Sequence, residues 1–172
     1  CLFAGSTAAA AAQSFVWAGF EDVVICPAGP GETPPDFDAA DCRTTTLREV
    51  DPQGRFIWVR TSVMLTEDFV AAPAPRGVFV SAKAASTVYL NGVRLGSNGR
   101  PGPDAGSEIP GRMDAVVFAP PDALRAGENT LVLLMSGHQS LIDLGHPLHV
   151  LGIGNHGDPT QRRLNQYWPA LR

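Results

Sequence analysis

The sequence has no excess of positive charge and no long apolar run. Its 172 residues include 13 Lys and Arg against 17 Asp and Glu, which gives a formal net charge of -4. A nucleic-acid-binding domain typically presents a basic face, so this balance argues against that class. No stretch approaches the roughly 18 consecutive apolar residues that a membrane-spanning helix needs.

Long uninterrupted segments are missing because glycine and proline are frequent. The chain contains 18 Gly and 15 Pro, and the apolar stretches between them are short. This composition disfavours a helical bundle and is typical of an all-β domain rich in turns. The length suits one domain with one core, and the sequence contains no internal repeat and no domain boundary.

The first 14 residues carry no charge and consist mainly of small side chains. They resemble the end of a secretory signal peptide, with an A-x-A-like cleavage site at residues 8–10 or 10–12. A basic region in front of them is absent, so this interpretation assumes that the sequence begins within the signal. Two alternatives remain open: a frayed Ala-rich helical start, and a lipoprotein whose lipidated first residue is Cys1.

The chain has three cysteines, and two of them flank a loop rich in proline and glycine. We predict a disulfide between Cys26 and Cys42, which would stabilise the domain by about 3 kcal/mol by restricting the unfolded chain. Export would place this bond in an oxidising compartment, where it persists. Two separate buried thiols are the alternative. Metal binding is disfavoured, since no CxxC pair or nearby histidine accompanies these cysteines.

Eight short segments combine β-branched and aromatic residues between turn signals, as strands do. Because the first half of residues 55–65 is apolar on both faces, we expect a central strand there. Asn91-Gly92 predicts a tight type I′ hairpin turn, since both positions of that turn need a positive φ. Short strands at this spacing predict an antiparallel jelly-roll β-sandwich. The eight segments are 15–25, 44–50, 55–65, 77–82, 86–95, 112–119, 130–135 and 146–153.

Three sequence pieces in this order resemble the galactose-binding-like jelly roll: FIWVRTSVML, STVYLNGVRLGSNG and LRAGENTLVL. In the last piece Gly127 permits a left-handed reversal and Asn129 can bond the loop backbone, so the motifs are structural. With the export signal, the Cys-to-Cys loop and an Arg/Tyr/Trp-rich C-terminus, the chain resembles extracytoplasmic sensor regions of bacterial membrane signalling proteins. These are histidine kinases and diguanylate cyclases. No membrane segment is present, so the resemblance implies one beyond Arg172.

The predicted organisation has three parts. Residues 1–14 are a signal-peptide remnant or are disordered, residues 15–158 form a single jelly-roll domain, and residues 159–172 form a C-terminal arm. We expect the arm to be a short helix or an extended segment that leads toward a membrane. Docking of the arm against the sandwich through Leu164, Tyr167 and Leu171 is the alternative.

Patterns for catalysis and metal binding are weak. The four histidines lie between residues 138 and 156, but no HExxH pattern or carboxylate at ligand spacing accompanies them. Ser136, His138 and Asp143 are the residue types of a hydrolytic triad, yet no G-x-S-x-G elbow occurs. No paired carboxylates at glycosidase spacing are indicated either. We therefore expect no catalysis by this chain, no cofactor and no metal.

A ligand-binding site is easier to derive. Aromatic rings and the forked donors of arginine are typical of sites that hold sugars and carboxylates. Because ligands are commonly held by loops on a rigid sheet, the loop at residues 96–111 is the favoured location. Each candidate has a structural alternative: a core position for the tryptophan, surface ion pairs for two of the arginines, and plain loop roles for the others. The candidates are Trp58, Arg60, Asn98, Arg100, Arg112 and His138.

The leading functional hypothesis is a non-catalytic periplasmic sensing domain of a histidine kinase or diguanylate cyclase, tethered to the inner membrane by segments beyond the C-terminus. Its partner would be a small molecule, such as a carbohydrate or carboxylate, or a periplasmic protein, and not a nucleic acid. The runner-up is a carbohydrate-binding or accessory module of a secreted glycoside hydrolase. A structural interaction domain without a small-molecule pocket is a third possibility.

Overall fold

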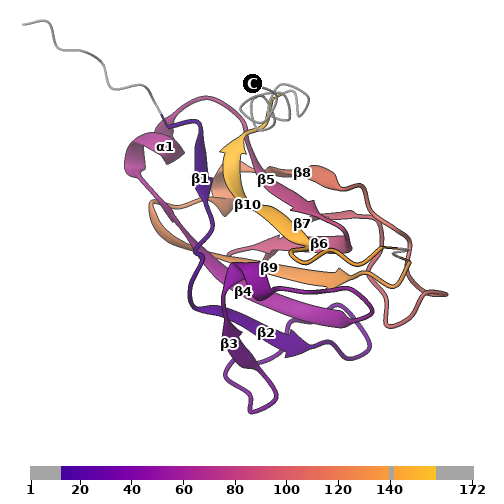
Figure 1. Ribbon diagram of the computed structural model, residues 1–172. Coiled ribbons are helices and arrows are strands. Elements are labelled where there is room, and N and C mark those ends of the chain that lie inside the picture. The colour runs from indigo at the N-terminus through magenta and orange to yellow at the C-terminus, as the bar shows by residue number, and fades with distance from the viewer. Residues whose placement is uncertain (1–12, 140–141, 158–172) are drawn as a thin grey trace, which may run out of the picture.

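The computed structural model describes residues 13–139 and 142–157 and shows two antiparallel sheets packed face to face. This is the β-sandwich expected from the short-strand pattern, and Figure 1 shows the two sheets as separate layers. One sheet has four strands in the order β1-β10-β5-β8, and the other has six in the order β3-β2-β4-β9-β6-β7.

The strands of the four-stranded sheet are β1 (Phe15–Trp17), β10 (Leu148–Asn155), β5 (Arg76–Ala82) and β8 (Asp114–Ala119). The strands of the six-stranded sheet are β3 (Arg43–Thr45), β2 (Val23–Pro27), β4 (Phe56–Leu65), β9 (Gly127–Ser136), β6 (Ala85–Leu90) and β7 (Val93–Asn98). Three short helices join them: η1 (Leu47–Glu49), α1 (Glu67–Ala71) and η2 (Pro121–Ala123).

The core lies between the sheets and consists of the inward residues of each strand. Val59 and Val63 of β4, together with Leu131 and Leu133 of β9, are at most 1% exposed. Because β4 and β9 pair along ten consecutive positions, they form the centre of the larger sheet. The expected central position of residues 55–65 is thus confirmed.

The Asn91-Gly92 hairpin is confirmed by backbone geometry. Asn91 and Gly92 have φ values of 50° and 82° between β6 and β7. The side-chain amide of Asn91 also donates through Nδ2 to Asn129 Oδ1 at 2.8 Å, and its Oδ1 accepts from Thr130 N at 2.9 Å. Asn129 is fully buried and donates to two carbonyls of the 125–127 reversal. Two of the three sequence pieces that carry the family resemblance are therefore joined by one hydrogen-bond network.

Two expectations about the early strands need correction. Residues 15–25 form two strands in different sheets, because the chain crosses over at residues 18–22, where Asp22 has a φ of 58°. Residues 44–50 are strand only through Thr45 and then form η1, which a capping box at Thr46 and Glu49 begins.

The disulfide is confirmed, with a Cys26–Cys42 sulfur distance of 2.07 Å. The loop that it closes lies over the outer side of the six-stranded sheet. There it covers Trp58, and Tyr89 donates its hydroxyl to Glu32 O at 3.0 Å. Burial raises the pKa of the Tyr89 phenol, and the nearby Glu32 carboxylate adds to this rise. A patch of the outer face is thereby turned into a small second core.

Candidate functional site

Four connections meet at one end of the sandwich, which we call the loop end. They are the two-residue β5–β6 turn at Lys83 and Ala84, the β7–β8 loop, the segment before β4, and the segment after β9. Gln53 joins the last two, since its side-chain amide donates to Leu144 O at 2.9 Å and accepts from Leu144 N at 2.7 Å. The Gln53 side chain therefore ties together two of the connections that the sheets bring to this end, and Figure 1 shows the course of the backbone there.

The β7–β8 loop contains residues 99–111 of the loop predicted at residues 96–111, whereas residues 96–98 belong to β7. The two ends of the loop are held together by hydrogen bonds. Asn98 donates to Arg112 O at 2.7 Å and accepts from Arg112 N at 2.8 Å. Arg100 forms a reciprocal backbone pair with Ile109, at 2.8 and 2.9 Å. Both predicted residues thus hold the shape of the loop.

A buried carboxylate fastens this loop to the end of β9. Glu108 is 6% exposed. It accepts from Ser136 Oγ at 2.5 Å, from the His138 amide at 3.0 and 3.1 Å, and from the Gln139 amide at 3.2 Å. Hydrogen bonds to an ionised acceptor are stronger than neutral ones, and a buried carboxylate needs them. Glu108 is therefore the main anchor of the loop.

Ser136 and His138 complete the anchor and do not act on each other. Ser136 is fully buried and accepts from Gly102 N at 3.0 Å through the hydroxyl that donates to Glu108. The His138 ring bonds Gly102 O through Nε2 at 3.0 Å. A hydrolytic nucleophile needs a base at its hydroxyl and access to substrate. Ser136 has no access to substrate because it is fully buried, and its hydroxyl donates to the Glu108 carboxylate and not to the His138 ring.

Asp104 clamps the tip of the same loop. Its carboxylate accepts from the backbone amides of Gly106 and Ser107, both at 2.9 Å, and from Ser107 Oγ at 3.0 Å. These hydrogen bonds stabilise the ionised carboxylate and so lower the pKa of Asp104 below its usual value. The bond from the Ser107 backbone amide has the largest effect, and the bond from the Ser107 hydroxyl the next.

This clamp predicts a local pH dependence. A lowered folded-state pKa contributes stability that is present above the unfolded value and is lost as pH falls through the folded one, here below about pH 4. An NMR titration of the Asp104 side-chain carbon should give a midpoint below that of an unfolded aspartate, and Ser107→Ala should raise it. An unchanged midpoint in the variant would contradict the clamp.

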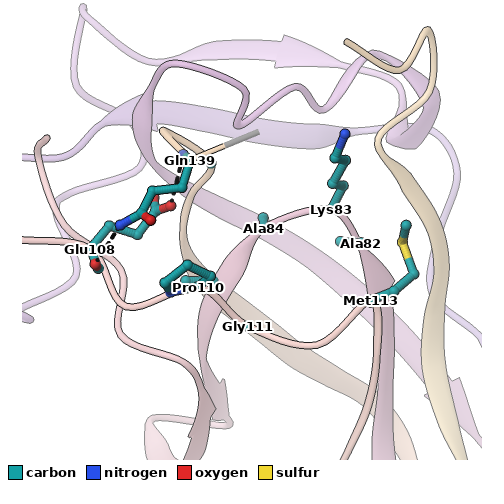
Figure 2. A pocket seen from close by; sticks show the side chains of 10 residues that line it. Ala82, Lys83, Ala84, Glu108, Pro110, Gly111, Met113 and Gln139 are labelled. Atoms are coloured by element: carbon teal, nitrogen blue, oxygen red, sulfur yellow. Dashed lines mark hydrogen bonds between the residues drawn. The ribbon is translucent and has the colours of Figure 1, made fainter. Parts of the chain in front are cut away.

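The loop end encloses a hollow of about 220 Å³ between the β5–β6 turn, the β7–β8 loop and the end of β9. Figure 2 shows the paired Glu108 and Gln139 on one side and Lys83 with Met113 on the other. Gln139 donates to the carbonyls of Ala105 and Glu108, which fixes its side chain against the loop. The remaining lining is Ala82, Ala84, Ala85, Pro110, Gly111 and Gly137.

The lining combines a cation, an amide and an acid with a mainly apolar wall. The Lys83 ammonium group donates one hydrogen bond to Ile142 O. An ammonium group has three N–H donors, so further donors remain for a ligand. A hollow of this size is smaller than a site for a drug-sized ligand, so it suits a single sugar ring or a carboxylate of similar size. Its walls supply hydrogen bonds and no aromatic stacking surface.

The structure does not bring the six predicted residues together. Asn98, Arg100, Arg112 and His138 lie at the loop end, whereas Trp58 and Arg60 lie on the outer side of the six-stranded sheet. Trp58 is 2% exposed beneath the disulfide loop and offers no surface to a ligand. Arg60 stacks over Phe37 at 5.0 Å and pairs with Asp38 at 3.9 Å.

The lining residues Lys83, Glu108 and Gln139 were not among the predicted candidates. Glu108 and Asp104 are the only acids within residues 96–111, and Lys83 is the only lysine of the chain. These two observations are the features of the sequence that could have drawn attention to Glu108 and Lys83. Burial of Glu108 depends on how the loop folds onto β9, which no local pattern reports.

In residues 13–139 and 142–157, no group of three or more His, Cys, Asp or Glu side chains is arranged to hold a metal ion. Within the same residues, no helix is long and apolar enough to cross a membrane. Residues 1–12 of the expected signal remnant at residues 1–14, and the whole of the expected C-terminal arm at residues 159–172, lie outside the described part of the chain.

No family model matches the chain, and no curated protein matches it. Among solved structures, a rhamnosidase from Novosphingobium sp. PP1Y is similar over 85% of this chain and 16% of its own, with 10% identity and a TM-score of 0.45. A beta-glucosidase from Kluyveromyces marxianus is similar over 86% of this chain and 19% of its own, with 17% identity and a TM-score of 0.40. The chain thus spans less than a fifth of either protein.

Proposed function

We propose that this chain is a non-catalytic extracytoplasmic binding domain that holds a small polar ligand in the hollow of its loop end. The observation that carries the proposal is the Glu108 anchor. A buried carboxylate fixes the β7–β8 loop against β9, and so preorganises the hollow that this loop lines. A wall that is rigid before binding costs little ordering entropy when a ligand enters.

The chemistry of the lining selects the class of ligand. The Lys83 ammonium group attracts a carboxylate and can donate hydrogen bonds to ligand hydroxyl oxygens, and the Gln139 side-chain oxygen is an acceptor for ligand hydroxyls. The apolar atoms of Ala84, Pro110 and Met113 suit the C–H groups of a sugar. A monosaccharide or uronic acid is therefore the proposed occupant.

A thermal-shift screen with galactose, glucose, glucuronate and acetate tests this binding. A ligand at 100 times its Kd stabilises a folded protein by about 2.7 kcal/mol, so a true ligand should raise the melting temperature measurably. Lys83→Met keeps the aliphatic stem but removes the charge, and it should abolish the shift. Arg43→Met, at an exposed position of β3, is the matched control and should keep it.

The wider context that we propose is a sensor region of a membrane-bound signalling protein, of the histidine kinase or diguanylate cyclase type. The Cys26–Cys42 disulfide supports an oxidising compartment. Occupancy of the hollow would act on the rest of the protein only if the ligand binds two conformations with different affinity.

Fractionation of cells that express the intact gene with a reporter fused beyond residue 172 separates this context from the accessory module of a secreted glycoside hydrolase. A membrane-associated product is expected for the sensor. A fully secreted product would overturn the sensor context and favour the accessory module, and the proposal of ligand binding would stand under either result.

A further inference from the structure

The described residues form two sheets with four edge strands, β1, β8, β3 and β7, and three of these edges are protected against pairing with another chain. β1 and β3 are each three residues long, and so short an edge strand offers little backbone to a partner. In β7 the register shifts where Val88 and Tyr89 of β6 meet it, and Arg94 adds a charge. Irregular pairing and charge are common means of protecting a sheet edge.

The fourth edge strand, β8, has none of these protections. It runs over six residues, DAVVFA, and pairs with β5 in one unbroken register. Its sequence contains no proline, and its one charged residue stands at the first position. Figure 1 shows β8 at the border of its layer, with β5 as its neighbour in the sheet. A groove of about 500 Å³ is lined by residues 114–117 of this strand, by residues 97–99 and by His156.

The pairing with β5 shows which backbone groups of β8 point toward the open side. Ala82 lies opposite Met113 in the antiparallel register, and its N–H donates to Met113 O at 2.8 Å. Hydrogen-bonded pairs alternate along such a ladder, so the odd-numbered residues of β8 bond β5 and the even-numbered residues point away from it. Val116 and Phe118 therefore each present an N–H and a C=O group to the open side, and no backbone group of a described loop bonds them there.

A row of such groups is a template for a further strand, and β8 matches this template with itself. Two copies of β8 can run antiparallel across a two-fold axis, which is the commonest symmetry of homo-oligomers. In one register Val116 lies opposite Phe118 of the second copy, and the two Val117 residues meet at the axis. Each of the Val116–Phe118 pairs then exchanges both of its backbone hydrogen bonds.

The side chains of the two copies also match in this register. Phe118 is 48% exposed on the outer side of the sheet, whereas its neighbour Ala119 points into the core and is 1% exposed. Val116 is on the same outer side as Phe118, because side chains alternate along a strand. The register therefore sets each exposed phenylalanine ring beside a valine of the second copy, and such aromatic–β-branched pairs stabilise sheets.

Charges beyond the strand ends are complementary in the same register. Arg112 stands two residues before β8, and it falls opposite Asp122 of the second copy, three residues after β8. Both residues are exposed, and the ion pairs of the described residues involve neither of them. The two-fold axis makes this contact twice. A register shifted by two residues would instead set the Asp114 carboxylate opposite the Phe118 ring, so the charges select one register.

We propose that the open edge of β8 pairs with β8 of a second copy, so that the two four-stranded sheets become one continuous sheet across a two-fold axis. This inference goes beyond the proposed ligand binding and does not depend on it. Gly111 and Met113 line the hollow and lead directly into β8. The antiparallel pairing therefore places the two hollows at opposite ends of the shared edge.

Amide hydrogen exchange of the full chain, measured by NMR at low and at high protein concentration, tests the pairing residue by residue. The chain carries Cys1→Ser, which excludes a disulfide between copies. The amides of Val116 and Phe118 should exchange at least about tenfold more slowly at high concentration, because they gain hydrogen-bond partners in the dimer. The amides of Ala115 and Val117 bond β5 in either state, so they are the internal control and should change far less. Sedimentation equilibrium of the same samples should show a monomer that becomes a dimer.

Three variants identify the surface that associates. Phe118→Lys places a charge on the edge and should abolish the dimer. Trp17→Lys is the matched control, because Trp17 is equally exposed, at 48%, but lies on β1 at the opposite edge of the same sheet, and it should leave the dimer intact. Arg112→Glu should raise the Kd of the dimer by at least about fivefold, since it sets two like charges together at both contacts. Arg112→Glu combined with Asp122→Arg should restore the wild-type Kd.

A dimer that slows exchange at Val116 and Phe118 and is lost in Phe118→Lys supports the proposal. A chain that stays monomeric at every concentration overturns it, and so does a dimer that persists in Phe118→Lys. Slow exchange at these two amides that does not depend on concentration also overturns it, because another part of the same chain would then cover the edge. Failure of the charge exchange at Arg112 and Asp122 to restore the dimer contradicts the register.

Discussion

Replacing Glu108 by alanine should destabilise the domain by roughly 2–4 kcal/mol, because the change leaves buried donors without an acceptor. The Ser136 hydroxyl and the His138 amide both lose their partner inside a closed anchor, and a new cavity forms beside them. Urea unfolding of the variant and the wild type measures the change in the free energy of unfolding. Hydrogen exchange should also show that residues 99–111 lose protection before the sheets do.

Two further variants make this result specific. Glu108→Gln keeps the side-chain volume but turns an NH₂ group toward the backbone donors. It should therefore lower the free energy of unfolding by a measurable amount, but by less than Glu108→Ala. Glu21→Ala removes an exposed carboxylate from the β1–β2 connection and should stay within about 0.5 kcal/mol of the wild type. A Glu108→Ala variant as stable as the Glu21 variant would show that Glu108 does not anchor the loop.

Replacing both Cys26 and Cys42 by serine should lower the free energy of unfolding by about 3 kcal/mol, the chain-entropy value for a loop of this size. A second consequence is structural, because the released loop covers Trp58 and Tyr89. We therefore expect the double variant to expose an indole that is nearly inaccessible in the wild type. Urea unfolding measures the first effect, and acrylamide quenching of tryptophan fluorescence measures the second.

Cys1→Ser is the matched control for the cysteine pair, since it removes a sulfur outside the disulfide. It should leave both stability and quenching unchanged. The covering role of the loop is wrong if the free energy of unfolding of the double serine variant lies within about 1 kcal/mol of the wild-type value and acrylamide quenches the tryptophan fluorescence of both proteins equally.

The features that the sequence predicted well are those decided by local chemistry. Asn91-Gly92 determines its turn through two positive φ values, and the first half of residues 55–65, which is apolar on both faces, identifies a central strand wherever it pairs. The disulfide followed from two cysteines that flank a segment without regular structure of its own. In each case the signal and the structure lie within the same few residues.

The features that were missed depend on pairing between distant parts of the chain. Residues 15–25 look like one strand, but Phe15–Trp17 pairs with β10 in one sheet and Val23–Pro27 pairs with β4 in the other. Trp58 is the residue type of a sugar platform and became a core residue because a remote loop folds over it. Glu108 looks like an ordinary loop acid until the end of β9 surrounds it.

The most direct test of the binding site is an NMR titration of the ¹⁵N-labelled domain with glucuronate, galactose, glucose and acetate. We expect saturable shifts at amides that line the hollow, Ala84, Gly111 and Gly137, and none at Ser62 and Thr130, which lie toward the opposite end of the six-stranded sheet. Lys83→Met should remove these shifts while the rest of the spectrum stays the same. Shifts that cluster away from the loop end, or that persist in the Lys83 variant, would contradict a ligand site in the hollow.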